Sequence, residues 1–322
     1  MNDRIAGHTA GKYPDSWYAA TAPLLPSFPS LEGEETADVC VIGGGYTGLS
    51  AALHLKKKGY DVVLLETQRV GWGASGRNGG HVGTGQRADQ ASIEKWVGLE
   101  AAKGLWQLGL DAVEKVCELI DEHQIDCELG SGNLHLAAKP SHAGELQEEL
   151  EHLESQYGYQ QLSYLSPDAV AELTSAQGFY GALLDDGCRH LHPLKYAVGL
   201  ARAAAQAGVR IYEHSRAQPA PNGQSGEVKT AQGHVKSQHV VLGCNAYLGK
   251  LIPRLAGNIM PINNFVIATE PLPSHLLPRI NRDNLSMSDT LFVINYWKLS
   301  EDGRMLFGGG ENYSSRFPRD IK

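Results

Sequence analysis

Hydrophobic and polar positions follow two different periods along the chain, and the first change of period lies between residues 37 and 66. The stretch from Asp38 to Glu66 contains a short apolar run, three glycines in a four-residue span, an amphipathic run and a second short apolar run. A short apolar run bounded by turn residues is typical of a buried strand. The pattern therefore predicts a βαβ unit with two parallel strands.

The next apolar positions predict helices. Positions from Ile93 to Val97 and from Trp106 to Ile120 recur at roughly helical spacing, which predicts two consecutive helices with a break near Gly104. Leucines at 146, 150 and 153 predict one apolar stripe on an acidic surface helix. Residues 192–208 carry a proline in the first turn and a glycine at the end, which predicts another helix.

Period-two and short apolar runs predict strands in the rest of the chain. We expect strands at 131–139, 209–215 and 238–247, and at 263–271, 290–299 and 304–311 after Pro261. The last two are expected to form a hairpin across residues 300–303. Parallel units early in the chain and antiparallel strands late in it predict an α/β (α+β) fold with two interleaved, discontinuous domains.

The domain boundaries follow from these changes in pattern. Residues 1–34 contain four prolines with Trp17 and Tyr18, and we expect an extended N-terminal arm. Residues 35–86 and 190–257 are expected to form one domain, and residues 87–189 and 258–322 the other.

Composition narrows the function classes. The 322 residues are 42% hydrophobic, which allows a sizeable core, and the net charge of −8 with dispersed Lys and Arg argues against nucleic-acid binding. No run of about eighteen apolar residues predicts a membrane span, and the first thirty residues lack signal-peptide features, so a cytoplasmic protein is expected. Five scattered cysteines without a CxxC pair favour neither disulfides nor zinc.

The stretch "GGGYTG" carries the first candidate chemistry. Gly43, Gly45 and Gly48 fit the spacing GxGxxG directly after a predicted strand and at the start of a predicted helix. Glycines there allow a tight turn, close approach of a pyrophosphate and close helix packing. Glu66 ends the second strand, where a carboxylate accepts hydrogen bonds from an adenosine ribose. The pattern indicates an adenine dinucleotide site, with a purely structural βαβ turn as the alternative.

A second glycine-rich stretch, "GWGASGRNGGHVGTG" at 71–85, follows the βαβ unit. A nicotinamide dehydrogenase would normally continue with a third strand and another βα unit, whereas this chain continues with a glycine-rich loop and long helices. Such a loop suits close backbone approach to a long, flat cofactor and favours FAD over NAD. A flexible connector is the alternative.

Together these stretches, with "HPLKYAVGLARAAAQAGV", "VVLGCNAY" and "NYWKLSEDGRMLFGGG", resemble the glycine oxidase/D-amino-acid oxidase family of flavoproteins over nearly the whole chain. Within it, the chain is most similar to bacterial γ-glutamylputrescine oxidases and γ-glutamyl-polyamine oxidases. The resemblance implies FAD as cofactor. It also implies a Rossmann-like FAD-binding domain interleaved with an antiparallel-sheet substrate domain, as in p-hydroxybenzoate hydroxylase, and oxidation of a C–N bond in polyamine or putrescine degradation.

The resemblance also implies cofactor-binding residues. The ADP part would lie against Gly43, Gly44, Gly45, Tyr46, Thr47, Gly48, Glu66 and Thr67. The ribityl chain and flavin would lie along Ser75, Gly76, Arg77, Asn78, Gly79 and Gly80. The adenine would meet the backbone of Ala217, and Cys244, Asn245 and Ala246 would lie near the cofactor. Arg77 as part of a surface ion pair is the alternative for that residue.

For the reaction, the resemblance implies a small-molecule amine as substrate. A hydride would pass from the carbon next to a neutral amine to flavin N5, and the imine would hydrolyse to aldehyde and ammonia. Oxygen, giving hydrogen peroxide, or another acceptor would take the electrons. An aromatic pocket that favours the neutral amine would help, and Tyr296, Trp297 and Phe292 are candidates for it, with plain packing as the alternative.

Several alternatives stay open. The enzyme rival is a D-amino-acid, glycine or sarcosine oxidase or dehydrogenase. The family pattern continues with a further FAD-domain segment that is absent after Lys322, so a non-catalytic flavin-binding remnant is also an alternative. Covalent attachment of the flavin through His81 is open, as is the oligomeric state. Cys188, His190 and His192 alternate like a ligand set, although no metal is expected.

Overall fold

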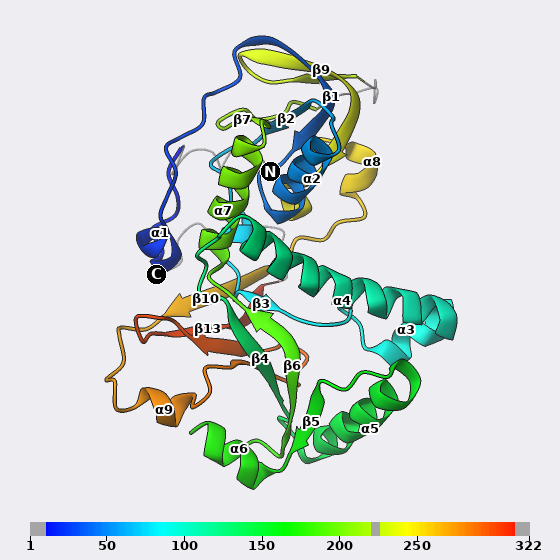
Figure 1. Cartoon of the computed structure of the whole chain (residues 1–322), viewed down its shortest axis with the longest axis vertical. Helices are drawn as coiled ribbons and strands as arrows, with labels where there is room; N and C mark the ends of the chain where they lie inside the picture. Colours follow the sequence, from blue (N-terminus) through cyan, green and yellow to red (C-terminus); the bar gives the residue numbers. More distant parts are fainter. Residues whose placement is uncertain (1–10, 220–225, 313–322) are drawn as a thin grey trace.

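The computed structural model describes residues 11–219 and 226–312, which form two β-sheets with helices around them (Figure 1). The helices are α1 (Trp17–Thr21), α2 (Tyr46–Lys57), α3 (Gln90–Val97), α4 (Leu99–Glu122), α5 (Pro140–Tyr157), α6 (Pro167–Leu173), α7 (Pro193–Gln206), α8 (Pro253–Ala256) and α9 (Leu277–Ile280), with 3-10 turns η1 (Ala74–Gly76) and η2 (Asn245–Leu248). The strands are β1 (Gly33–Ile42), β2 (Val62–Leu65), β3 (His81–Val82), β4 (Gly130–Leu136), β5 (Leu162–Leu165), β6 (Ala182–His190), β7 (Arg210–Tyr212), β8 (Glu227–Lys229), β9 (Gly233–Leu242), β10 (Asn263–Ala268), β11 (Ser286–Asp289), β12 (Tyr296–Leu299) and β13 (Met305–Asn312).

The first sheet has the order β7-β2-β1-β9-β8 and lies in the upper part of Figure 1. Strands β7, β2, β1 and β9 are parallel, and β8 pairs antiparallel with β9. Helices α2 and α7 cover one face, where they pack on Val39 and Val41, while Cys40 and Ile42 point into a second apolar cluster on the other face. Burial on both faces explains the continuous apolar run of β1 and confirms the predicted βαβ unit.

The second sheet has the order β10-β13-β12-β11-β4-β6-β3, and β5 also pairs with β6. Its pairs are antiparallel except β11 with β4. Leu134 and Leu136 of β4 pack with Met287 and with helix α6 on one face. Because neighbouring residues of a strand face opposite sides, His135 lies on the other face. The mixture of parallel and antiparallel sheets confirms the predicted fold class.

The start of the chain differs from an extended arm. Residues 17–21 form helix α1, which begins where the Ser16 hydroxyl accepts a hydrogen bond from the amide of Ala19 (3.2 Å). Tyr18 is buried beside Leu194 of α7 and Leu306 of β13. Helix α1 therefore packs against elements of both sheets. Residues 1–10 lie outside the described part of the chain.

Two predicted boundaries were wrong. The break between the two helices lies at Gly98, whose φ of +82° ends α3, and Gly104 lies inside the continuous helix α4. The expected strand 290–299 is only β12, since Asp289 Oδ1 accepts hydrogen bonds from the amides of Leu291 (3.2 Å) and Asn295 (3.0 Å) and makes the chain turn. Strand β11 before this turn was not predicted. The hairpin across residues 300–303 is confirmed by pairing of β12 with β13.

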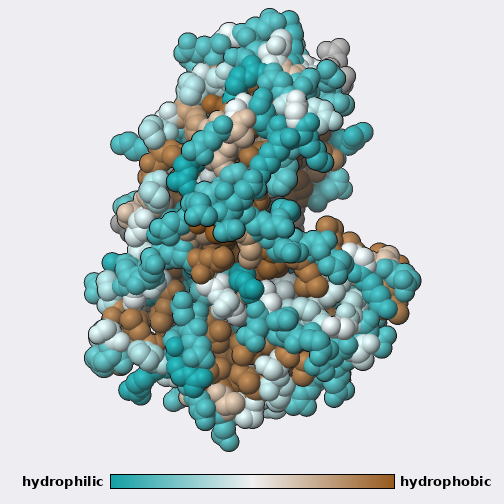
Figure 2. Space-filling view, in the orientation of Figure 1, coloured by the Kyte–Doolittle hydropathy of each residue, from teal (hydrophilic) through white to brown (hydrophobic). Residues whose placement is uncertain are grey.

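The surface has an apolar area on helices α3 and α4. Hydrophobic side chains gather at the outer end of α3 and α4 (Figure 2), where Trp96 is 70% and Val97 49% exposed. Within residues 11–219 and 226–312, no helix is both long and apolar enough to cross a membrane.

Candidate cofactor and substrate site

The turn between β1 and α2 places glycines where any side chain would collide with backbone. Gly43 has a φ of +109°, and a Cβ atom there would lie 2.5 Å from the carbonyl oxygen of Gly243. A Cβ atom on Gly48 would lie 1.8 Å from the carbonyl oxygen of Gly43. Gly45 is the N-cap of the 12-residue helix α2 and offers no side chain, and the exposed Thr47 lies in the first turn. Bare backbone at this helix start lets an anion approach the N–H groups.

Glu66 follows β2, and its carboxylate lies over this glycine turn. Its Oε2 accepts a hydrogen bond from the amide of Gly44 (2.6 Å), and its Oε1 accepts one from Gln68 (2.8 Å). Burial raises the pKa of the Glu66 carboxyl group, and the two amide donors partly offset that effect. Carboxylate oxygens accept more than one hydrogen bond each, so a ribose hydroxyl group can still bind here. Thr67 is exposed next to it.

A third strand ends at the same edge of the sheet. Strand β9 runs parallel to β1 and pairs Leu242 with Ile42. Cys244 follows, its thiol donating to the carbonyl oxygen of Ile42 (3.4 Å), and burial raises its pKa to about 11. Asn245, with a φ of +46°, and Ala246 begin the turn η2. These residues lie with Gly43 and Glu66 at the carboxyl ends of parallel strands, where open α/β sheets bind ligands.

Ala217 lies on a different side of the first sheet. It is 9% exposed in the apolar cluster that covers the face opposite α2 and α7, together with Val63 and Val228. Its place after β7 puts it beside the end of β2, because β7 pairs with β2 up to Leu65.

The loop 71–80 is held in shape by Asn78. Its Oδ1 accepts from the amide of Gly80 (2.8 Å), and its Nδ2 donates to the carbonyl oxygens of Ala74 (3.0 Å) and Ser75 (3.2 Å). The Ser75 hydroxyl in turn accepts from the amide of Tyr46 (3.1 Å) at the start of α2. Asn78 therefore organises the loop against the glycine turn. The buried Gly76 also fits only without a side chain, since a Cβ atom would lie 2.2 Å from the carbonyl oxygen of Gly71.

Arg77 bridges this loop to the end of β9. Its guanidinium carbon lies 4.5 Å from the ring centre of Trp72, and its Nη2 donates to the hydroxyl of Tyr247 (3.1 Å). Among the described residues Arg77 forms no ion pair, so the surface ion-pair alternative was wrong for that part of the chain.

A chain of hydrogen bonds continues from the loop into the second sheet. The amide of Leu191 donates to the carbonyl oxygen of Gly80 (2.8 Å), and Lys298 Nζ donates to the carbonyl oxygen of Leu191 (2.7 Å). Lys298 is 2% exposed on β12, and burial lowers its pKa to about 8. The loop that touches the glycine turn is thus fixed to the sheet below it.

The face of the second sheet next to this loop is polar. We call it the polar face, and its members are Asn133 and His135 on β4, Ser286 and Ser288 on β11, and Tyr296 on β12. Asn133 Nδ2 donates to Ser286 (3.0 Å), and the Ser288 hydroxyl donates to Asn133 Oδ1 (3.3 Å). The ring of Tyr296 lies against Gly79, where a Cβ atom would be 2.5 Å from it. A ligand along Gly79 therefore meets the polar face.

His81 packs edge-on against Tyr296, with ring centres 5.5 Å apart. Its Nε2 lies 3.3 Å from the carbonyl oxygen of Met287, and burial lowers its pKa to about 4. His81 is therefore neutral at pH 7, and its Nε2–H is the donor to that carbonyl group.

The three predicted aromatic residues do not meet in one pocket. Tyr296 lies on the polar face, whereas Trp297, the next residue, points to the opposite face and stacks on Phe307 (6.0 Å, 17°). Phe292 lies in the turn after β11 and is 89% exposed. Adjacent strand residues face opposite sides, so a shared pocket was wrong for this set, and Tyr296 alone of the three lies beside the loop.

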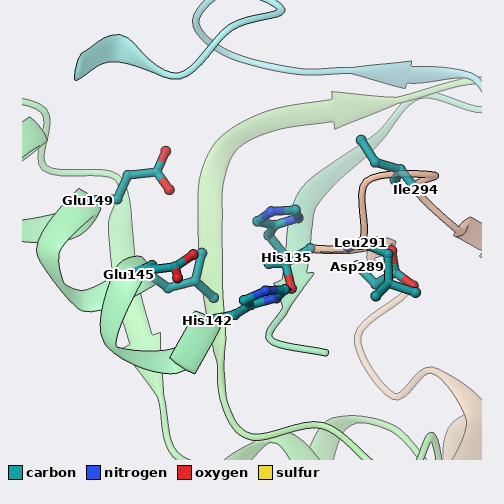
Figure 3. Close-up of a pocket in the computed structure, with 9 residues that line it drawn as sticks. His135, His142, Glu145, Glu149, Asp289, Leu291 and Ile294 are labelled. Carbon is teal, nitrogen blue, oxygen red and sulfur yellow. Dashed lines mark hydrogen bonds between the residues drawn. The ribbon is translucent and has the colours of Figure 1, made fainter. Parts of the chain in front are cut away.

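A cavity of about 240 Å³ opens where the polar face meets α5 (Figure 3). Glu145 and Glu149 of α5 stand on one side, and the rings of His135 and His142 lie between them and the segment 289–294. Sequence reasoning missed these residues. The alternation of Asn133 and His135 with leucines in β4 was the available signal for a polar face, but nothing in the pattern placed α5 over it.

Cys188, His190 and His192 separate in the structure. Cys188 Sγ donates to Asp185 (3.2 Å), His190 Nε2 lies 2.7 Å from the carbonyl oxygen of Asn284, and His192 Nδ1 accepts from the amide of Lys195 (3.1 Å) as the N-cap of α7. Each side chain has its own structural partner.

The residues at the first sheet and its loop fit FAD. The glycine turn offers bare backbone that a Cβ atom would block, and Glu66 stands beside it at the same sheet edge. The loop 71–80 leads from that turn to the polar face, the path that a cofactor with a dinucleotide part and a flavin needs.

Comparisons with known proteins agree with this geometry. Residues 38–321 match the family model described as FAD dependent oxidoreductase. The chain is 40% identical over 307 residues to "Probable oxidoreductase OrdL" of Rhizobium meliloti, covering 95% of this chain and 71% of that protein. It is 39% identical over 312 residues to gamma-glutamylputrescine oxidoreductase of Escherichia coli, covering 97% and 73%. The fold is similar to that of glycine oxidase from Geobacillus kaustophilus, with a TM-score of 0.69, 20% identity, and coverage of 89% and 74%.

Proposed function

Since the chain belongs to the family of FAD-dependent oxidoreductases, we propose that it oxidises a C–N bond of an amine, with γ-glutamylputrescine or a related γ-glutamyl-polyamine as substrate. The products would be an aldehyde and ammonia, with hydrogen peroxide if oxygen is the acceptor. The observation that carries this proposal is the 39% identity to the Escherichia coli gamma-glutamylputrescine oxidoreductase over 97% of this chain, a span that contains the whole site.

The proposed division of roles follows the two sheets. Amides of the turn Gly43–Gly48, including Gly44 and Gly45 with Tyr46 and Thr47, hold the pyrophosphate, and Glu66 with Thr67 holds the ribose. The loop Ser75–Gly80, with Gly76, Arg77, Asn78 and Gly79, lies along the ribityl chain and flavin, while Ala217 meets the adenine and Cys244, Asn245 and Ala246 border the cofactor. When bound, FAD supplies the acceptor for a hydride from the carbon next to the amine nitrogen.

This chain's own residues then orient the amine and control its protonation. Tyr296 lies beside Gly79 and offers its ring to the substrate chain, while the neutral His81 adds no positive charge of its own beside it. The amine must lose a proton before oxidation, because an ammonium nitrogen has no lone pair. A site that excludes water favours the neutral amine.

An anaerobic absorbance titration tests the proposal. The purified chain is loaded with FAD, and γ-glutamylputrescine, glycine, sarcosine and a D-amino acid are added separately. Bleaching of the flavin band by γ-glutamylputrescine alone is the expected result, with aldehyde formed in equal amount. Bleaching by an amino acid in its place would assign the site to amino-acid oxidation, and a flavin that no amine reduces would refute catalysis.

A further inference from the structure

The cavity beside α5 has the properties of a binding site for one end of a long substrate. Its floor is part of the polar face, and its walls are Leu146 of α5 and Leu291 and Ile294 of the segment after β11. Polar groups stand on the α5 side and at the base, as Figure 3 shows for Glu145, Glu149 and the two histidines. Asp289 and Thr290 also line it, so the cavity combines three apolar side chains with several convergent polar ones. Convergent polar groups beside apolar side chains are typical of sites for small molecules.

The polar face connects this cavity to the loop that lies beside Tyr296. Ser288 pairs directly with Tyr296 on one side and with His135 on the other. Neighbouring strands are about 4.8 Å apart, so two strand spacings put His135 about 10 Å from Tyr296 along the face. A substrate that reacts beside Tyr296 and Gly79 must therefore be long to reach the cavity.

The hydrogen bonds of Ser288 determine which ring nitrogen of His135 is free to accept a hydrogen bond. The single hydroxyl proton of Ser288 is donated to Asn133 Oδ1, so in the bond between Ser288 and His135 Nδ1 (2.9 Å) the histidine donates. Burial lowers the pKa of His135, so its ring is neutral and Nε2 carries a lone pair. Among the described residues, Nε2 has no hydrogen-bond partner.

The two glutamates bring carboxylate groups to the cavity that have no ion-pair partner among the described residues. Burial raises the pKa of the Glu149 carboxyl group, as do the nearby charges of Asp89 and Asp185. Glu145 and Glu149 are four residues apart on α5 and so share one face of the helix. Within residues 11–219 and 226–312, neither forms an ion pair with Lys, Arg or His.

Asp289 also lines the cavity, but its carboxylate already accepts three hydrogen bonds from Leu291 and Asn295. Glu145, Glu149 and His135 Nε2 leave three further acceptors around the cavity, and an ammonium group has three N–H donors.

We propose that this cavity binds the ammonium group at the far end of an extended amine substrate, with Glu145, Glu149 and His135 as its acceptors. The inference rests on the proposed function and deepens it, because it makes these residues specificity determinants for substrates with two amine groups. In γ-glutamylputrescine the reacting nitrogen and the α-ammonium nitrogen lie roughly 12 Å apart in the extended chain, by the reach of extended peptide. The terminal ammonium group of a free polyamine is the other source of the same chemistry.

Substrate analogues and matched variants test the inference. On the FAD-loaded chain, KM is measured for γ-glutamylputrescine, for glutarylputrescine, which lacks only the α-ammonium group, and for spermidine. The E145Q/E149Q double variant is compared with E148Q, which removes a charge from a neighbouring position of α5 that does not line the cavity. We expect the double variant to raise KM for γ-glutamylputrescine at least tenfold with kcat nearly unchanged, and E148Q to change neither.

The analogues identify the source of the ammonium group. Glutarylputrescine should have a high KM that the double variant leaves unchanged. A KM effect with γ-glutamylputrescine alone assigns the cavity to the α-ammonium group, and one with spermidine alone assigns it to a terminal polyamine ammonium group. Equal KM values for γ-glutamylputrescine and glutarylputrescine, together with no effect of the double variant on the KM for spermidine, would overturn the inference. Equal effects of E148Q and of the double variant would also overturn it.

Calorimetric binding separates this inference from the proposed function. When the flavin has been reduced chemically beforehand under anaerobic conditions, titration of γ-glutamylputrescine reports affinity without turnover. If no amine bleaches the flavin, the proposed function fails, while a loss of affinity in the double variant but not in E148Q still supports the cavity. Tight binding that neither variant changes refutes the cavity even when the flavin bleaches.

Discussion

The glycine at position 48 gives the sharpest test of how the cofactor turn is built. Gly48 and Gly104 both lie inside helices, α2 and α4, but their surroundings differ. A Cβ atom at Gly48 would lie 1.8 Å from the carbonyl oxygen of Gly43, whereas real Cβ atoms essentially never come within 3.0 Å of another atom. That carbonyl group would have to move by at least 3.0 − 1.8 = 1.2 Å. At Gly104 no atom beyond the neighbouring backbone of α4 itself lies within 4 Å of the added Cβ atom.

The two substitutions should therefore act in opposite directions. Replacing glycine by alanine inside a helix stabilises it by about 0.5–1 kcal/mol, and we expect that gain for Gly104→Ala. In Gly48→Ala the overlap with backbone costs about 3 kcal/mol, the upper part of the range for overpacking. A net loss of about 2 kcal/mol should remain at Gly48. Urea unfolding of both variants measures this difference.

Cofactor affinity provides the second readout. Movement of Gly43 by more than 1 Å misaligns the amides that face the pyrophosphate. We expect the binding free energy of FAD to weaken by about 2.7 kcal/mol, which is the contribution of one or two charge-assisted hydrogen bonds. Such a loss raises the Kd for FAD about a hundredfold. Quenching of flavin fluorescence measures Kd, and Gly104→Ala should leave it unchanged. If the Gly48 variant matches the Gly104 variant in stability and in Kd, the steric argument is refuted.

Three further changes test other contacts. Glu213→Gln removes the charge that pairs with Arg69 (2.7 Å) at a fully buried side chain, so the free energy of unfolding in urea should fall by about 3–5 kcal/mol, and a loss below about 1 kcal/mol would contradict a buried ion pair. Burial lowers the pKa of His190 to about 4 and of His192 to about 3, below the usual value of about 6.5, so each contributes stability above pH 6.5 that is lost as pH falls, by about 1.4 kcal/mol per pH unit. His192→Asn keeps a cap acceptor and should weaken the decline in unfolding free energy between pH 6.5 and pH 4, while an unchanged decline would exclude His192 as its source. Asn78→Ala removes the side chain that fixes the loop 71–80 and should raise the Kd for FAD about tenfold, whereas an unchanged Kd would show that the loop keeps its shape without it.

The local sequence pattern was enough to predict the βαβ unit of the first sheet, formed by β1, α2 and β2. The apolar run of β1, the glycines at 43, 45 and 48, and Glu66 after β2 are consecutive features, and parallel strands must end at the same edge of their sheet. Helix α7 was equally predictable, because Pro193 and Gly208 mark its ends. In each case the interactions that decide the structure join residues close in sequence.

The polar face and its cavity depend on contacts between distant segments. Strand β11 is too short to predict from its own residues, and it exists because it pairs with β4, about 150 residues earlier in the chain. The opposite directions of Tyr296 and Trp297 follow from the pleat of β12, once pairing has fixed its register. Glu145 and Glu149 of helix α5 look like ordinary surface residues in the sequence. The sequence by itself determined the cofactor turn, whereas only the tertiary structure brought α5, β4 and β11 together, because their contacts depend on strand pairing and packing rather than on local spacing.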